Sequence, residues 1–179
     1  MKLLVLALVA VALLFGACGA RGIAIRKDLI AERQAIDADW AQVDAALGQR
    51  ADLVPELASL VQSEAPAAAG AVLAVEDSRN VLIGAHSQQE KVQANARLDE
   101  SLARLMLLVE AFPKLESSRR YGDLLEALKD DEYRIAVARR KYNEAVEHYN
   151  AHIDLFPNNI VASVTRLGKI DAYFQTPAI

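Results

Sequence analysis

At 179 residues the chain suits one domain, and a domain near this size buries about 70% of its unfolded surface, so it needs no disulfide or metal to fold. It is 53% hydrophobic and 25% charged, which excludes a disordered protein, and its single cysteine excludes an internal disulfide. A formal charge of −4 offers no general attraction for nucleic acid, so we predict no nucleic-acid partner. Aromatic residues make up only 6% of the chain, and glycine and proline are sparse, which favours helices over sheets.

The first twenty residues, MKLLVLALVAVALLFGACGA, are interpreted as a targeting or anchoring segment outside the fold. Positions 3–15 are strongly apolar, as in the core of a signal peptide, and the uncharged run to position 20 reaches the lower limit for spanning a bilayer. Gly16-Ala17-Cys18 resembles the lipobox of bacterial lipoproteins, in which the cysteine is lipidated and becomes the mature N-terminus. Cys18 is therefore the candidate lipidation site, and a periplasmic or extracytoplasmic lipoprotein is the favoured interpretation.

An uncleaved transmembrane helix is the alternative interpretation of this leader. Arg21, Arg26 and Lys27 after the leader outnumber Lys2 before it, and this charge bias would leave the following domain in the cytoplasm. Both interpretations hold the domain at a membrane, which is the first expected partner.

A long amphipathic helix is predicted over residues 26–63, because its apolar residues recur alternately three and four positions apart. Arg50 interrupts this seam. Pro55 removes one backbone hydrogen bond and should kink the helix, but the seam keeps its phase across it, so we expect one kinked continuous helix. The seam consists of Ile36, Trp40, Val43, Leu47, Val54, Leu57 and Val61.

Three more helices are expected after the first. The second is predicted from near Pro66 to just before Gly84, since proline suits a first turn and glycine a C-terminal cap. The third begins at the capping box Ser87-Gln88-Gln89-Glu90 and ends at Pro113. The fourth follows "KLESS", and its seam is Leu124, Leu128, Ile135, Ala138, Tyr142, Ala145, Tyr149 and Ile153.

The predicted fold is all-α: an antiparallel up-and-down four-helix bundle with two long and two shorter helices, spanning residues 24–157 behind the N-terminal membrane anchor of residues 1–20. Near the membrane only the two long helices would lie side by side. Trp40 and Tyr149 would then lie in or near a less covered region, which makes them candidate docking residues, and burial in the core is the favoured interpretation.

A C-terminal tail is expected over residues 158–179. Its apolar residues recur near helical spacing with basic residues between them, so the tail either lies in the membrane interface or folds back on the bundle. The apolar residues are Ile160, Val164, Leu167 and Phe174, and the basic ones are Arg166 and Lys169.

Four stretches of the chain resemble the LemA family of bacterial membrane-anchored helical proteins. They are "RADLVPEL" at 50–57, "LMLLVEAFPKL" at 105–115, "RIAVARRKYNEAVEHYN" at 134–150 and "LFPNNIVA" at 155–162. The resemblance implies a four-helix up-and-down domain behind one membrane segment, and it implies no catalytic residue or cofactor. A cysteine at the end of the leader is a departure from the family's usual pattern.

Candidate chemistry is confined to the predicted fourth helix. Glu144, His148 and His152 are spaced so that they could share one face and hold a metal, although "HYNAH" lacks the glutamate of H-E-x-x-H, and a solvated surface is the favoured interpretation. Arg134, Arg139, Arg140 and Lys141 form a basic patch that could bind phosphate or anionic lipid, with a charged outer face as the favoured alternative. The chain contains no phosphate-binding or nucleophile motif, so we predict neither an enzyme nor a cofactor.

Tyr142 and Tyr149 should face into the bundle, while Asn143 and Asn150 could bridge to a neighbouring helix and set its register. The predicted function is that of a non-catalytic, membrane-anchored scaffold or adaptor of the bacterial cell envelope. Its expected partners are envelope proteins and a further copy of the chain. The alternative is a metal- or ligand-binding sensor built on the fourth helix.

Overall fold

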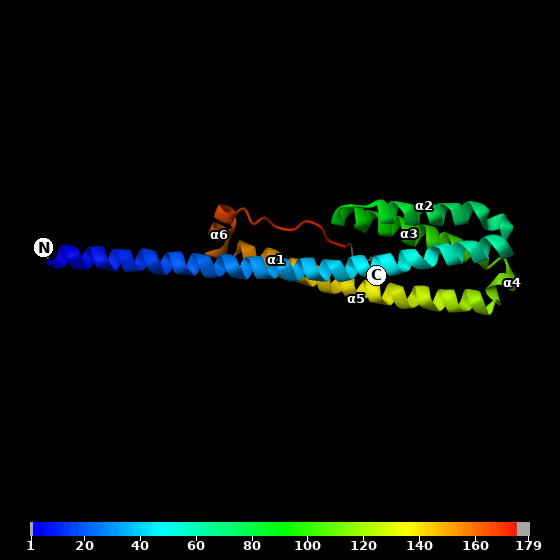
Figure 1. Ribbon diagram of the computed structural model, residues 1–179, viewed down its shortest axis with the longest axis horizontal. Coiled ribbons are helices and arrows are strands. Elements are labelled where there is room, and N and C mark those ends of the chain that lie inside the picture. The colour runs from blue at the N-terminus through cyan, green and yellow to red at the C-terminus, as the bar shows by residue number, and fades with distance from the viewer. Residues whose placement is uncertain (1, 175–179) are drawn as a thin grey trace. The chain divides into compact units, whose positions relative to one another are not determined.

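The computed structural model describes the backbone of residues 2–174 and the side chains of residues 19–174 (Figure 1). All regular structure in that range is helical, which confirms the all-α class. The elements are α1 (Lys2–Glu64), the 3-10 turn η1 (Pro66–Ala68), α2 (Ala69–Gly84), α3 (Gln88–Val109), α4 (Pro113–Glu116), α5 (Arg119–Asp154) and α6 (Asn158–Thr165). Within the described part of the chain, no helix combines the length and apolarity needed to cross a membrane.

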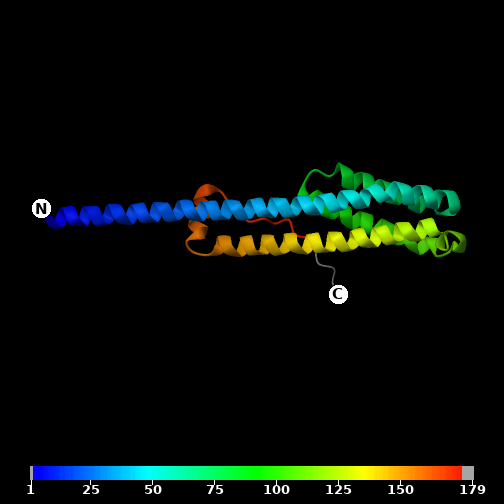
Figure 2. The same ribbon diagram turned by 60° about the horizontal axis from the view of Figure 1, so that its bottom comes forward.

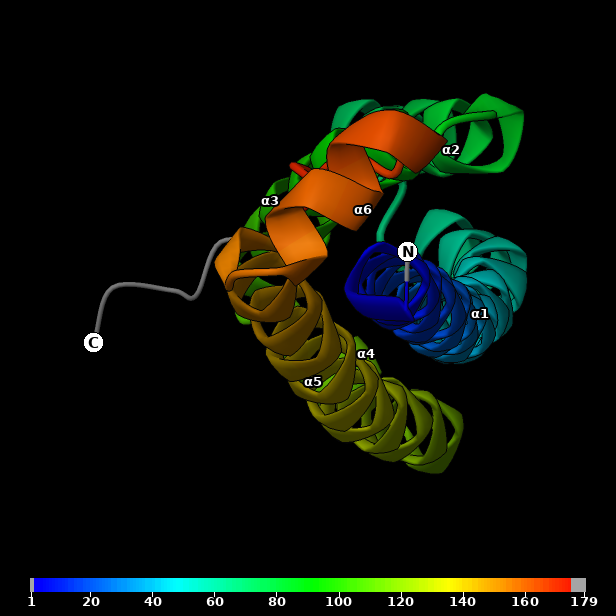
Figure 3. The same cartoon turned by 90° about the vertical axis from the view of Figure 1, so that its left-hand side faces the viewer.

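The chain divides into two compact units. Unit 1 contains α1 up to Ala38, together with Glu144–Asp171, which includes the end of α5, α6 and most of the tail. Unit 2 contains Asp39–Asn143 and the tail from Ala172 onward. In unit 1, α6 lies beside α1 in all three ribbon views (Figures 1, 2 and 3).

Helix α1 extends without a break from Lys2 to Glu64, so the leader and the first helix of the domain form one element. No proline occurs before position 55, and nothing in residues 2–54 obliges the helix to end. The side chains of residues 1–18, including Cys18, lie outside the described residues.

Pro55 lies inside α1 without ending it, as predicted. Proline has no N–H, so the Ala51 carbonyl four residues earlier loses its usual partner. Arg79 of α2 replaces that partner, because its Nε donates a hydrogen bond of 2.7 Å to the Ala51 oxygen. A side chain from a neighbouring helix thus satisfies the carbonyl that the proline leaves unpaired.

The predicted seams are the buried faces of their helices. Every seam residue expected in α1 is buried except Trp40, which is half-buried. In α5, Ala138 and Ala145 are half-buried and the other six expected residues are buried. Tyr142 and Tyr149 are both 0% exposed, so the inward orientation predicted for them is correct.

The capping box at the start of α3 is confirmed. The Ser87 hydroxyl accepts a hydrogen bond from the Glu90 amide at 3.1 Å, and the Glu90 carboxylate accepts bonds from the amides of Ser87 at 3.1 Å and His86 at 2.9 Å. These two amides lower the pKa of the Glu90 carboxyl below its ordinary value of 4.5, since they stabilise the charged form.

The predicted end of the third helix is wrong by one short turn. α3 ends at Val109, and Pro113 begins the separate four-residue helix α4. Phe112, the residue before the proline, has φ −120° and ψ 79°, which is the non-helical backbone that a following proline favours.

Unit 2 is a helical bundle whose elements are connected by side-chain bonds. Helices α2 and α3 lie side by side in it (Figures 1 and 2). From α3, Lys91 forms an ion pair with Asp44 of α1. Between α5 and α3, the Tyr142 hydroxyl donates to Gln88 Oε1 at 3.2 Å.

Candidate functional site

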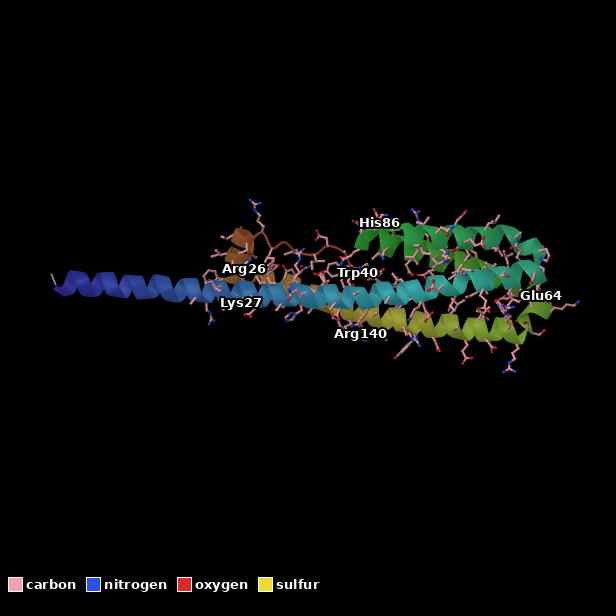
Figure 4. The ribbon with its side chains drawn as sticks, in the orientation of Figure 1. Arg26, Lys27, Trp40, Glu64, His86 and Arg140 are labelled. Carbon is pink, nitrogen blue, oxygen red and sulfur yellow. The ribbon has the colours of Figure 1, made fainter. Side chains whose placement is uncertain are left out.

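An aromatic cluster in unit 2 brings together α1, α5 and the C-terminal tail. Trp40 stacks on Phe174 with ring centroids 5.7 Å apart, and Tyr142 meets Trp40 edge-on at 5.3 Å and Phe174 at 6.0 Å. Phe174 is 3% exposed. The guanidinium carbon of Arg139 lies 4.7 Å from the centre of the Phe174 ring. Phe174 therefore packs on Trp40, which the sequence offers as a candidate docking residue. Figure 4 marks the position of Trp40 on α1.

Asn143 of α5 holds the backbone of the same tail residue. Its Nδ2 donates to the Phe174 carbonyl at 2.9 Å, and its Oδ1 accepts from the Phe174 amide at 3.1 Å. An amide side chain can donate and accept in this paired way just as a neighbouring strand would. The bridge to a neighbouring helix that we expected of Asn143 is replaced by a bond to the extended tail.

Asn150, seven residues later, makes the same paired contact in unit 1. Its Nδ2 donates to the Ile170 carbonyl at 2.8 Å, and its Oδ1 accepts from the Ile170 amide at 2.9 Å. The Tyr149 hydroxyl donates to the Gly168 carbonyl at 3.3 Å. Asn150 thus bonds the backbone of the tail, as Asn143 does, and does not bridge to a neighbouring helix in these bonds.

The tail up to Phe174 folds back on α5 because its turn is defined by the end of α6. Arg166 adopts a left-handed backbone with φ 57°, and the next amide, that of Leu167, bonds the Ala162 carbonyl at 3.0 Å. This is the pattern of a helix C-cap, which sends the chain away from the helix axis. Of the two alternatives for the tail, residues 167–174 show the fold-back.

A buried ion network in unit 2 explains the interruption of the α1 seam. Arg50 is 7% exposed, and its Nη1 contacts Asp99 of α3 and, at 2.9 Å, Glu132 of α5. Asn95 donates to Asp99 at 2.9 Å. A buried arginine needs such carboxylates, because an unpaired buried charge is costly. One side chain of α1 thus connects two other helices.

Arg139 of the aromatic cluster lies near enough to this network to feel its charges. Burial lowers the pKa of Arg139 below its ordinary value, and the nearby carboxylates of Asp99 and Glu132 oppose that shift. The guanidinium stays charged, because arginine is not deprotonated in proteins. Arg139 therefore supplies a partly buried positive charge beneath Phe174.

The four basic residues predicted as a patch on α5 differ in their surroundings. Arg139 is half-buried, Lys141 forms an ion pair with Asp39 at 2.7 Å, and Arg134 and Arg140 are exposed. Phosphate binding would need several of these groups to converge on one point.

The histidines of α5 lie close together but do not form a metal site with Glu144. The His148 and His152 rings are 6.0 Å apart, and His152 Nδ1 lies 2.8 Å from Glu32 Oε1 of α1, within unit 1. Among the described residues, no group of three histidine, cysteine, aspartate or glutamate side chains is placed to hold a metal. The contact with Glu32 was not anticipated, because residues 120 positions apart give no local signal.

A surface groove of about 440 Å³ separates α2 from α3 in unit 2. Small residues of α2 line one side, namely Gly70, Ala71, Ala74 and Ser78. Leu108 of α3, which is 45% exposed, lines the other side. An exposed leucine in a groove of small residues is typical of a surface that receives a partner helix.

Comparison with known proteins adds a family and two relatives. A family model described as the LemA family matches residues 39–178. Magnetosome protein MamQ 2 of Paramagnetospirillum magneticum is 33% identical over 85 residues, which is 48% of this chain and 31% of that protein. Magnetosome protein MamQ of Magnetospirillum gryphiswaldense is 31% identical over 85 residues, again 48% of this chain and 31% of that protein. The match thus covers less than a third of these relatives.

Proposed function

The chain belongs to the LemA family, and from that premise we propose that it is a non-catalytic, membrane-anchored helical scaffold or adaptor of the bacterial cell envelope. It acts through protein–protein contacts. The proposal includes the up-and-down order of four helices in the bundle and an anchor in the N-terminal leader.

The groove between α2 and α3 is the observation that carries the scaffold role. Its small residues let a partner helix approach closely, and Leu108, which is 45% exposed, offers an apolar contact in its lining. Arg97 and Arg104 line the same groove, with Glu100 between them in the sequence, so a partner with complementary charges would be oriented as well as bound. The proposed partner is an amphipathic helix of an envelope protein.

The anchor is supported by the leader sequence and by the similarity to magnetosome proteins. Lipidation at Cys18 remains the favoured form, which places the domain outside the cytoplasm, and an uncleaved helix is the alternative. A Cys18→Ala change separates them. In a lipoprotein it abolishes palmitate labelling and changes the mass of the membrane-bound form, whereas an uncleaved helix is unaffected in both respects.

Site-specific crosslinking in cells tests the scaffold role. A photoreactive residue at Leu108, which lines the groove and is 45% exposed, should give discrete adducts with a protein partner, and the adducts should disappear when Ala74→Arg fills the groove. A photoreactive residue at Tyr133 of α5, which is 72% exposed in the same unit, is the matched control. The scaffold role is refuted if both positions give the same adducts, or if neither gives any.

A further inference from the structure

We propose that α6 and the turn before it form a lipid-contacting surface that lies in the headgroup layer of an anionic bilayer, beside the membrane anchor. The inference rests on the anchor of the proposed function and adds the second point of membrane contact. The residues that carry it all belong to unit 1.

The turn and α6 expose their large apolar side chains instead of burying them. Phe156 is 80% exposed, Val164 79%, Leu155 60% and Ile160 55%. The buried residues of α6 are Asn158 and Ala162, so the inner face is the smaller and more polar one. A helix of a water-soluble domain normally shows the opposite arrangement.

The turn and α6 themselves carry no negative charge, and Asp154, which directly precedes the turn, forms an ion pair with Lys169 at 2.7 Å. Residues 155–167, LFPNNIVASVTRL, contain no acidic residue, and the first acidic residue of the whole chain is Asp28. Arg21, Arg26 and Lys27 of α1 and Arg166 at the end of α6 are all exposed. Apolar side chains flanked by basic ones match the acyl boundary and the anionic headgroups of a membrane.

The first basic residues of α1 span a length that matches the thickness of a headgroup layer. Arg21 is the first charge after the leader, and at 1.5 Å per residue Arg26 lies about 7.5 Å further along the helix. The headgroup layer of one leaflet is about 5–8 Å thick. Figure 4 shows Arg26 and Lys27 on α1 beside α6. Ile23, between these positions, is 62% exposed. Because α6 lies beside the stretch of α1 that continues from the leader, lipid is favoured over a second copy of the chain as what contacts the exposed apolar residues of α6.

The test uses the full-length chain reconstituted in vesicles of phosphatidylglycerol and phosphatidylcholine. In a Trp40→Phe background, which removes the only tryptophan, Phe156→Trp is compared with Tyr133→Trp in unit 2. Brominated acyl chains should quench Phe156→Trp about twofold or more relative to Tyr133→Trp, since only the former would sit at the acyl boundary. Quenching should weaken when phosphatidylglycerol is omitted.

A second measurement needs no substitution. Amide hydrogen exchange over residues 155–167 of the native chain should be slower on phosphatidylglycerol vesicles than on phosphatidylcholine vesicles alone. Equal exchange on the two, together with equal quenching of the two tryptophans, overturns the inference. A blue-shifted Phe156→Trp emission without bromine quenching also overturns it, because it indicates a protein cover such as a second copy.

Flotation with the vesicles separates this inference from the proposed function. If the chain floats with the vesicles but Phe156→Trp is not quenched, the anchor is supported and only the α6 contact is refuted. If the chain does not float, both the anchor and the α6 contact are refuted.

Discussion

Replacing Phe174 with alanine tests whether the tail is part of the folded domain. The side chain is 3% exposed and contacts the rings of Trp40 and Tyr142 and the guanidinium of Arg139. Phe174→Ala removes all of these contacts and uncovers Trp40, which is the only tryptophan of the chain.

The expected loss of stability follows from these contacts. Burying a phenylalanine side chain contributes about 1.5–3 kcal/mol. The two ring pairs add about 0.5–1.5 kcal/mol each, and the contact with Arg139 adds about 0.5–1 kcal/mol. Release of the Phe174 backbone regains about 1–2 kcal/mol of conformational entropy. We therefore expect the free energy of unfolding to fall by about 2–5 kcal/mol, which is close to the range for Phe→Ala in a core.

Denaturant unfolding followed by tryptophan fluorescence measures both consequences. The native emission of Phe174→Ala should be shifted to the red because water reaches Trp40, and its unfolding midpoint should be lower. Phe156→Ala is the matched control, since the same substitution at an 80% exposed position leaves Trp40 covered.

The reasoning is refuted if Phe174→Ala and Phe156→Ala have the same native emission and the same midpoint. Asn143→Leu supplies an independent check, because it removes the two hydrogen bonds to the Phe174 backbone. The double variant should lose less stability than the sum of the two single losses, since both substitutions release the same segment of the tail.

Three further predictions concern the bundle of unit 2. Arg79→Met should lower the free energy of unfolding by about 1–2 kcal/mol, because it leaves the Ala51 carbonyl of α1 without a partner. In a Pro55→Ala background the loss should be clearly smaller, since the restored amide satisfies the same carbonyl. Equal losses in the two backgrounds, measured by chemical denaturation, would count against this role of Arg79. Arg50→Met should lower the free energy of unfolding by about 2–3 kcal/mol, which is below the range for fully buried ion pairs because both carboxylate partners are partly exposed. Arg50→Lys keeps the charge and should lose less stability. A thermal melt in which both variants match the parent would show that the network is dispensable. Glu90 has a pKa below its ordinary 4.5 in the folded protein, so its contribution to stability is present above pH 4.5 and is lost as the pH falls through the lower folded value. The difference in melting temperature between the parent and Glu90→Gln should therefore shrink below pH 4.5, and a difference that is constant with pH would contradict the assignment.

The sequence alone determined the main helices of the described domain and the buried faces of the two long ones, α1 and α5. The capping box at Ser87, the continuity of α1 across Pro55 and the inward orientation of Tyr142 and Tyr149 follow from local signals: cap chemistry, seam phase and three-and-four spacing. Each signal acts within a few residues of chain, so it can be read without knowing what lies opposite.

Only the tertiary structure decided what these faces meet. Arg50 was recognisable as a break in a seam, but its carboxylate partners lie 49 and 82 positions away, and Phe174 meets Asn143 across 31 positions. The sequence also does not predict that the apolar residues of α6 point outward. Residue spacing shows which residues share a face of a helix, but not what that face meets. Pairing of distant residues depends on the packing of whole helices, and that packing is a property of the folded chain rather than of any short segment.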